Sequence, residues 1–516
     1  GADTAGDRNV AIGVQALTSQ NFTSTTDSYN VAIGYNAGYA ISTGVENTTV
    51  GGLSLDANTT GGRNTAYGYG SLGANTTGSY NTALGKGALD ANTTASHNVA
   101  IGVDSLGANT TGTDNVAVGA NALDANTTGN DNTGIGDNAL GANTTATGNT
   151  AVGADALITN STGASNVAVG KDALEANTTA DNNTAVGLAA MQANTTGTSN
   201  TAVGTYSLDA NTTANNNTAV GYASLTANTT GYQNSGMGTS ALAANTTANN
   251  NSALGYYALT ANTTGENNTA IGASSLGANT TASNNTAVGK GALLLNTTGT
   301  QNVAVGTFAL DANTTADNNT AIGYSALGLN TTASNNTAVG RAALADNTTG
   351  TANSALGAYS LDANTTGSYN TGIGYNNLTS NTTGQSNTAV GFEALKDNVS
   401  GASNTAVGVY ALFDNTASNN TAVGRDALKL NTTGTSNTAV GDTSMASQTT
   451  GSNNTALGRR SLDASTTGSE NTAVGERSLS ALTTGSDNAF VGYLSGDAIT
   501  NGINNSGCGA GALGNL

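Results

Sequence analysis

The chain has 516 residues and a formal net charge of −19. Proline and tryptophan are absent, and charged residues make up 8% of the sequence, against about a quarter in an average globular domain. The acidic balance argues against binding to nucleic acid or to anionic membranes, which both require clustered Lys and Arg. Regularly spaced aliphatic residues distinguish the chain from a disordered one, so we expect an ordered, repetitive fold.

A seventeen-residue repeat runs from Asn9 to the partial copy that begins at Asn505. Each copy reads Asn-(Thr/Val)-Ala-(Val/Ile)-Gly-x-x-(Ala/Ser)-Leu-x-Ala-Asn-Thr-Thr-(Gly/Ala)-x-x, and we number its positions 1 to 17 from the first Asn. The spacing has a four-residue insertion after Asn9, and one residue is missing from the copy that begins at Asn404. A unit this short fits one coil of a parallel β-solenoid, and the sequence predicts about thirty such coils.

Each coil is expected to contain two short strands joined by tight turns. In one copy, the first strand is predicted at residues 286–288 and the second at 291–293, and the Asn-Thr-Thr segment supplies the residue types of a turn. Because no linker divides the array, the sequence predicts one continuous all-β domain over residues 1–516. Its first coils, at 1–46, are irregular, and its terminal coils, at 489–516, are degenerate.

The two aliphatic positions, 4 and 9, are predicted to form the core as two columns of stacked side chains. Four successive coils contribute Val288, Val305, Ile322 and Val339 to the first column, and Leu293, Leu310, Leu327 and Leu344 to the second.

The Asn and Gly positions are predicted to shape the backbone. Asn at positions 1 and 12 would form amide ladders from coil to coil, as in stacked cross-β assemblies. Gly at position 5 does not vary, which indicates positive φ or a close backbone approach, whereas position 15 alternates between Gly and Ala and is therefore expected to have an ordinary negative φ. In three coils these residues are Asn285, Asn302, Asn319, Asn296, Asn313, Asn330, Gly289, Gly306 and Gly323.

Position 3 is almost always Ala, as at Ala287, Ala304 and Ala321. Period-two alternation places it on the opposite face from position 4. We interpret a small outward residue in every coil as the contact of a lateral trimer or bundle. The alternative is that Ala faces a narrow interior while positions 2 and 4 face outward. Either arrangement leaves an apolar column that a second chain could cover.

The five residues from Asn98 to Gly102 read Asn-Val-Ala-Ile-Gly, and Ser105 and Ala108 follow them. This pattern resembles the head repeats of YadA-like trimeric autotransporter adhesins, which implies a left-handed β-roll wound as a homotrimer. The repeat here is about three residues longer. With its Asn-Thr-Ala-Val-Gly and Asn-Thr-Thr-Gly phrases it is also similar to repeat arrays of phage tail fibres and bacterial surface proteins, which implies a cell-surface or virion-fibre setting.

The residues needed for catalysis are scarce. The only His, His97, takes a position that other coils fill with Asp, Asn or Ser, so a nucleophilic triad or a zinc site is not expected. The only Cys, Cys508, takes a position that other coils fill with Val or Ile. We expect no enzymatic activity and no cofactor. A column of carboxylates could bind calcium, although other residues interrupt it; its members are Asp90, Asp124, Asp209, Asp311 and Asp362.

Two surface signals are weaker. Asn-Thr-Thr is an N-glycosylation sequon as well as a turn. Tyr residues gather just after the Gly of position 5, where they could stack on a glycan or on another fibre; these are Tyr222, Tyr256, Tyr257, Tyr324 and Tyr375.

The sequence therefore favours a non-catalytic extracellular fibre, filament or adhesin stalk that associates with copies of itself, either laterally or end to end through residues 15–29 and 490–516. One alternative is a phage tail-fibre-like rod that binds a receptor or surface glycan. Another is an ice-binding solenoid. The adjacent pair Thr297 and Thr298 argues against ice binding, because neighbouring residues cannot share one strand face.

Overall fold

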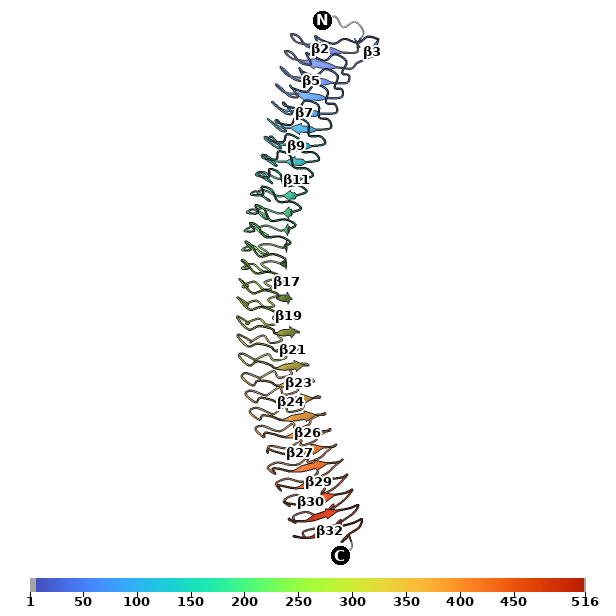
Figure 1. Ribbon diagram of the computed structural model, residues 1–516, viewed down its shortest axis with the longest axis vertical. Coiled ribbons are helices and arrows are strands. Elements are labelled where there is room, and N and C mark those ends of the chain that lie inside the picture. Colours follow the sequence, from blue (N-terminus) through green and yellow to red (C-terminus); the bar gives the residue numbers. More distant parts are fainter. Residues whose placement is uncertain (1–5, 515–516) are drawn as a thin grey trace. The chain divides into compact units, whose positions relative to one another are not determined.

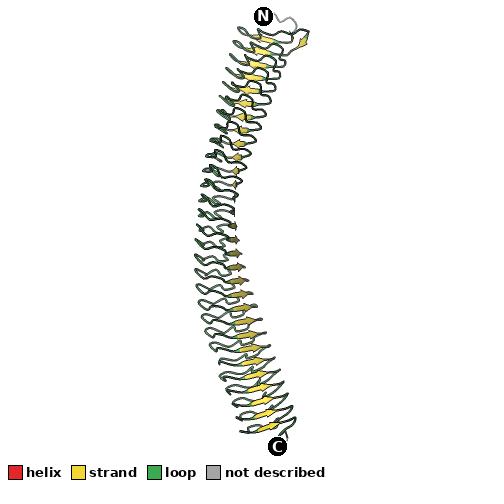
Figure 2. Ribbon diagram, viewed as in Figure 1, coloured by secondary structure: helices red, strands yellow, loops and turns green. Residues whose placement is uncertain are grey.

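The computed structural model describes residues 6–514, and all regular secondary structure in this range is β-strand (Figure 2). The chain forms two compact units, Gly1–Tyr256 and Tyr257–Leu516. Each unit is a parallel β-solenoid whose coils follow the seventeen-residue repeat, with successive strands stacked one above the next (Figure 1). This confirms the predicted fold class, while continuity from one unit to the next stays a prediction.

The first unit opens with an irregular segment. β1 (Gly6–Asp7) pairs in parallel with β3 (Thr26–Asp27), and this two-stranded sheet is separate from the main ladder. β2 (Val10–Ile12) pairs across the longer first coil with β4 (Val31–Ile33). Residues 1–5 of the predicted irregular segment lie outside the described range.

From β4 to β17, consecutive strands of the first unit pair in parallel and in register, so equivalent repeat positions stack on one another. The further strands of this unit are β5 (Thr48–Val50), β6 (Thr65–Tyr67), β7 (Thr82–Leu84), β8 (Val99–Ile101), β9 (Val116–Val118), β10 (Thr133–Ile135), β11 (Thr150–Val152), β12 (Val167–Val169), β13 (Thr184–Val186), β14 (Thr201–Val203), β15 (Thr218–Val220), β16 (Ser235–Met237) and β17 (Ser252–Leu254).

The second unit repeats this arrangement, and its last strand pairs like the others. Residues 515–516 of the predicted degenerate coils lie outside the described range. The strands of this unit are β18 (Thr269–Ile271), β19 (Thr286–Val288), β20 (Val303–Val305), β21 (Thr320–Ile322), β22 (Thr337–Val339), β23 (Ser354–Leu356), β24 (Thr371–Ile373), β25 (Thr388–Val390), β26 (Thr405–Val407), β27 (Thr421–Val423), β28 (Thr438–Val440), β29 (Thr455–Leu457), β30 (Thr472–Val474), β31 (Ala489–Val491) and β32 (Ser506–Cys508).

The predicted second strand is wrong. Residues 291–293 belong to a turn that covers repeat positions 6 to 11, which we call the leucine turn. Gly291 and Leu293 have φ of 63° and 52°, in the left-handed region that an extended strand cannot adopt. The turn still bonds from coil to coil, since the Leu293 N–H donates to the Ala309 carbonyl at 3.0 Å. For residues other than Gly, the left-handed backbone conformation costs free energy, so the residue pattern favours a strand at Leu293 over a left-handed turn.

The predicted leucine column is confirmed as part of the core. Its members have no exposed surface, and they pack inside the coil from the leucine turn toward the strand. They are Leu293, Leu310, Leu327 and Leu344.

The predicted aliphatic column at position 4 is wrong, and so is the predicted contact role of position 3. The interior side of the strand carries Ala287, Ala304 and Ala321, which have no exposed surface and therefore cannot contact another chain. Val288, Val305, Ile322 and Val339 lie on the outer side and are partly exposed, Ile322 by 39%.

The physical reason for this reversal is the width of the interior. Position 3 of each coil faces the leucine of the preceding coil. Where Gly134 replaces the usual Ala, a Cβ added there would lie 3.3 Å from Leu123 Cγ. A methyl group therefore fills the remaining space, and a valine would overpack it.

Both Asn columns are buried ladders, as predicted. The backbone N–H of Asn302 donates to Asn285 Oδ1 at 2.9 Å, and Asn302 Nδ2 donates to the Ala316 carbonyl at 2.8 Å. Asn313 Nδ2 donates to Asn296 Oδ1 at 2.8 Å and to the same Ala316 carbonyl at 3.1 Å. The position-15 carbonyl thus joins the start of the strand to the Asn-Thr-Thr turn.

The glycine predictions are also confirmed. Gly289, Gly306 and Gly323 have φ of 133°, 134° and 136°, and an added Cβ at Gly306 would lie 2.5 Å from the Gly323 carbonyl oxygen. Gly299 at position 15 lies outside the left-handed region, and Ala316 takes its place in the next coil. The sign of φ therefore explains why position 5 is always Gly and position 15 is not.

The missing residue after Asn404 is absorbed in the Asn-Thr-Thr turn. Asn415 Nδ2 donates to the Ala417 carbonyl, two residues ahead instead of the usual three, at 2.8 Å. The ladder is kept, because the Asn420 N–H still donates to Asn404 Oδ1 at 2.9 Å. The ladder therefore determines the coil register, and the turn adapts.

We expect Asn319→Ala to open its coil. The substitution leaves the Asn336 N–H and the Ala333 carbonyl, both now bonded to Asn319, without that partner in the interior. Roughly 2–5 kcal/mol of local stability should be lost, measured as faster hydrogen exchange at the amides of residues 319–353. Thr315→Ala, at an exposed position of the preceding turn, is the matched control and should change exchange little. Unchanged exchange in Asn319→Ala would contradict a structural role of the ladder.

Candidate interaction face

The outward side chains of the strands form one continuous column pair in each unit, which we call the strand face. It consists of repeat positions 2 and 4 of β4–β17 in the first unit and of β18–β32 in the second. Position 2 is mostly Thr, with some Val and Ser, and position 4 is Val, Ile or Leu in nearly every coil. Some position-4 side chains are strongly exposed, among them Leu254 at 50% and Leu356 at 51%.

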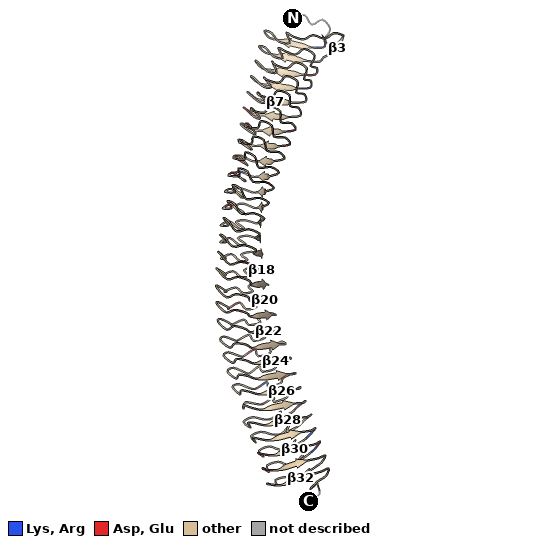
Figure 3. Cartoon of the chain, viewed as in Figure 1, with Lys and Arg blue, Asp and Glu red and all other residues tan. Residues whose placement is uncertain are grey.

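No charged residue lies in strands β4–β32, as the tan strands of Figure 3 show. Apart from Asp7 in β1 and Asp27 in β3, the Lys, Arg, Asp and Glu residues of the described range lie in turns and loops. The partly or strongly exposed aliphatic side chains of position 4 thus continue as one apolar stripe over more than a dozen coils of each unit. Surfaces of this kind mark interaction sites, so the strand face is the candidate functional site.

Register makes the strand face periodic. Successive strands pair residue for residue, for example Thr286 with Val303 and Val288 with Val305. Each column therefore repeats at the strand spacing of about 4.8 Å. Cys508, exposed at the last position 4, belongs to this face.

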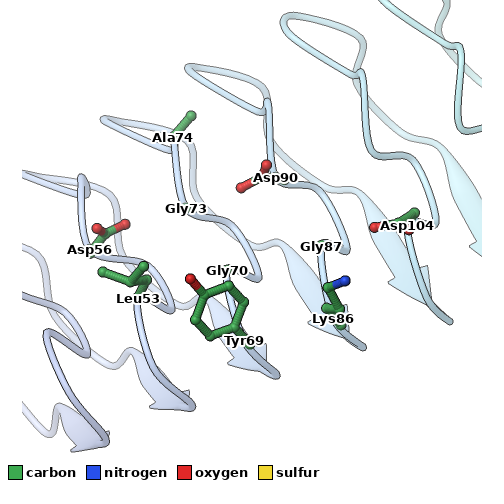
Figure 4. Close-up of a pocket in the computed structure, with 10 residues that line it drawn as sticks. All are labelled: Leu53, Asp56, Tyr69, Gly70, Gly73, Ala74, Lys86, Gly87, Asp90 and Asp104. Atoms are coloured by element: carbon green, nitrogen blue, oxygen red, sulfur yellow. The ribbon is translucent and has the colours of Figure 1, made fainter.

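The leucine turns of the first unit enclose a shallow hollow of about 510 Å³. Tyr69 and Lys86 line it together with the carboxylates of Asp56, Asp90 and Asp104, which come from separate coils (Figure 4). Partial burial raises the pKa of Asp56 and Asp90, and the carboxylates of Asp90 and Asp104 next to them add to the rise.

The suggested calcium column is not assembled by the fold. Asp90 and Asp124 occupy the same position two coils apart, with Gly107 between them, so their backbones are about 10 Å apart. A calcium ion binds oxygen ligands at Ca–O distances of up to about 2.6 Å, so carboxylates this far apart cannot be expected to share one ion. Within residues 6–514, no three His, Cys, Asp or Glu side chains come close enough to hold a metal.

The remaining sequence signals lie apart from one another. His97 is exposed in a turn and stacks on Tyr80, with ring centroids 5.0 Å apart. The Asn of the Asn-Thr-Thr sequon, as at Asn296, is fully buried with its Nδ2 bonded inside the coil, so the folded chain does not present it for glycosylation. The tyrosines after position 5 are exposed, as at Tyr222 and Tyr324.

Comparison with models of known protein families, with curated protein sequences and with solved structures finds no significant match. Over the part of the chain that the structure describes, there is no helix with the length and hydropathy of a membrane span.

We expect the solenoid to become more stable as the pH falls from about 7 toward the ordinary pKa of aspartate, near 4. Burial raises the pKa of Asp124, Asp311 and Asp362 as it does at Asp56 and Asp90, so the folded chain takes up protons at a higher pH than the unfolded chain. The contribution of these groups to stability is then complete below the unfolded pKa and is lost as the pH rises through the folded pKa. Thermal unfolding followed by circular dichroism at several pH values measures this.

The control for this prediction is Asp362→Asn, which removes one such carboxylate without changing its shape. It should raise the melting temperature at pH 7 and weaken the pH dependence of the stability of its own coil. A melting temperature that falls steadily between pH 7 and about pH 4 would contradict the assignment.

Proposed function

We propose that the chain is the repeat region of a non-catalytic extracellular structural fibre, in which copies of the solenoid associate laterally through their strand faces. The observation that carries the proposal is the uncharged, periodic strand face, with aliphatic side chains at position 4 in nearly every coil.

The periodicity of the strand face favours a second copy as its partner. A surface that repeats at about 4.8 Å makes equivalent contacts in every coil only with a partner of the same repeat. At roughly 25 cal/mol per Å², burying about 40 Å² of each position-4 side chain contributes about 1 kcal/mol per coil. Contributions of this size add along the stack, so weak contacts in each coil produce firm association of whole chains.

The number of chains is proposed from the resemblance to trimeric adhesin heads. Three strand faces turned toward a common axis would each be covered, as would two strand faces packed together. The resemblance favours three. The turns would then form the outer surface, and their polar, sparsely charged composition suits a cell-surface or virion-fibre setting.

A second candidate function, ice binding, is favoured by one observation. Thr286 and Val288 lie on the outer side of the same strand, so the relevant Thr column is position 2 and not the adjacent pair Thr297 and Thr298. Each coil thus presents one hydroxyl or methyl group and one aliphatic side chain in a regular array. Val303 interrupts the Thr column, and the constant aliphatic position 4 suits packing against another chain better.

Lateral association predicts that cysteines on the strand face cross-link. In a Cys508→Ser background, Val305→Cys should form an interchain disulfide under mild oxidation. The matched control, Thr298→Cys on the exposed Asn-Thr-Thr turn, should not. Replacing position 4 by Lys in every coil from Val288 to Val440 should reduce the mass measured by light scattering from several chains toward one. A wild-type chain that stays monomeric at high concentration would refute the proposal.

Ice binding and lateral association predict opposite outcomes in a thermal-hysteresis assay. A strand face covered by another chain cannot contact ice, so we expect no hysteresis from the associated wild-type protein. Hysteresis that is abolished by Thr286→Tyr and Thr320→Tyr, which disturb the flat array, would instead favour ice binding.

A further inference from the structure

Four successive coils of the second unit carry aromatic rings on their leucine turns. We call this set the aromatic ridge, and its members are Tyr359, Tyr375, Phe392, Tyr410 and Phe413. Only five Phe and seventeen Tyr occur in the whole chain, so an unbroken run of rings over consecutive coils is a local concentration. It lies at repeat positions 6, 7 and 10, whereas the strand face consists of positions 2 and 4.

The rings are in contact along the whole ridge. Tyr359 meets Tyr375 edge to face, with centroids 6.1 Å apart, and Tyr375 stacks on Phe392 at 5.8 Å with an interplanar angle of 11°. Phe392 then meets Tyr410 at 5.5 Å, and Tyr410 meets Phe413 at 5.6 Å, both edge to face. The backbone ladder beneath the rings holds them at one coil spacing, so the ridge is preorganised.

Two residues of the ridge, Tyr375 and Phe392, are exposed to solvent and have no cation from the described part of the chain over their rings. Tyr375 is 46% exposed and Phe392 is 39% exposed. Parallel rings in van der Waals contact have planes roughly 3.5–4 Å apart. A centroid distance of 5.8 Å therefore includes a large lateral displacement, and each ring covers only part of its neighbour's face.

Three cations of the chain itself lie over rings of the ridge. Arg341 lies over Tyr359 at 5.5 Å, Lys396 over Phe413 at 5.0 Å and Lys429 over Tyr410 at 4.7 Å. Lys396 also pairs with Glu393 at 3.3 Å, and Lys429 pairs with Asp426 at 3.1 Å. These cations occupy the cation positions on three of the rings, and acidic partners neutralise two of them. A strongly charged ligand of either sign is therefore not favoured.

We propose that the aromatic ridge binds a neutral, extended glycan that lies along the ridge. A chain of equatorially linked pyranoses presents an apolar ring face at each residue, which stacks on an aromatic face. The partly exposed Asn376, which follows Tyr375 in the sequence, supplies an amide as a hydrogen-bond partner for hydroxyl groups. Because the rings are already ordered, little conformational entropy is lost on binding. The proposal does not rest on lateral association, since the ridge and the strand face use different repeat positions.

The test is isothermal titration calorimetry of the full chain with cellohexaose and chitohexaose, which are neutral and β-linked, and with α-linked maltohexaose. We expect at least one β-linked hexaose to bind more tightly than maltohexaose. The double variant Tyr375→Ala/Phe392→Ala should weaken this binding about tenfold or more. Tyr375→Phe keeps the ring and should keep the affinity.

Tyr324→Ala is the matched control, because Tyr324 occupies the same repeat position as Tyr375 and is 54% exposed. It should change the affinity less than about twofold. Circular dichroism and melting temperatures establish that each variant is folded. The proposal is overturned if no β-linked hexaose binds the wild-type chain, if Tyr324→Ala weakens binding as much as the double variant, or if the folded double variant binds normally.

Discussion

The carbonyl at repeat position 15 is the point on which each coil depends. It accepts one hydrogen bond from the Asn that opens the strand of its own coil and another from the Asn that opens the following turn, as Ala316 does from Asn302 and Asn313. Replacing the Asn that opens the strand removes one of these two bonds and also leaves the buried N–H of the next Asn without its acceptor, as at Asn319 and Asn336, and an unpaired buried group costs more than one bond contributes. The shortened coil after Asn404 shows this priority, since its turn changes shape while its ladder is kept.

The narrow interior is the second constraint. The last coils show that it limits the total volume of the side chains inside and does not require one residue type at each position. Phe490 takes the place of the usual Ala at position 3 and is fully buried. Gly496 replaces the usual Leu in the same coil, and a Cβ there would lie 2.9 Å from Phe490 Cδ1. Gly507 replaces the Ala of the next coil, where a Cβ would approach Phe490 Cε1 to 2.6 Å. One large side chain thus moves from the turn to the strand, and its neighbours shrink to fit.

These two constraints free the outward positions for interaction. Because every coil keeps the same register, any outward residue type that recurs becomes a straight column, and any local cluster becomes a ridge. The strand face uses positions 2 and 4 throughout each unit, whereas the aromatic ridge uses positions 6, 7 and 10 of four coils. A single chain can therefore carry a face for its own copies and a separate surface for another ligand.

The sequence by itself determined the repeat, the solenoid, the Asn ladders, the leucine column and the need for Gly at position 5, because each of these follows from one residue type recurring at one spacing. Only the tertiary structure decided which side of the strand faces inward. Alternation gives Ala287 and Val288 opposite sides without saying which is inside, and the leucine packed in the adjacent coil leaves room for a methyl group alone. The left-handed leucine turn and the ring contacts of the aromatic ridge could not be predicted from the sequence either. Both depend on how neighbouring coils stack and not on the order of residues within one coil.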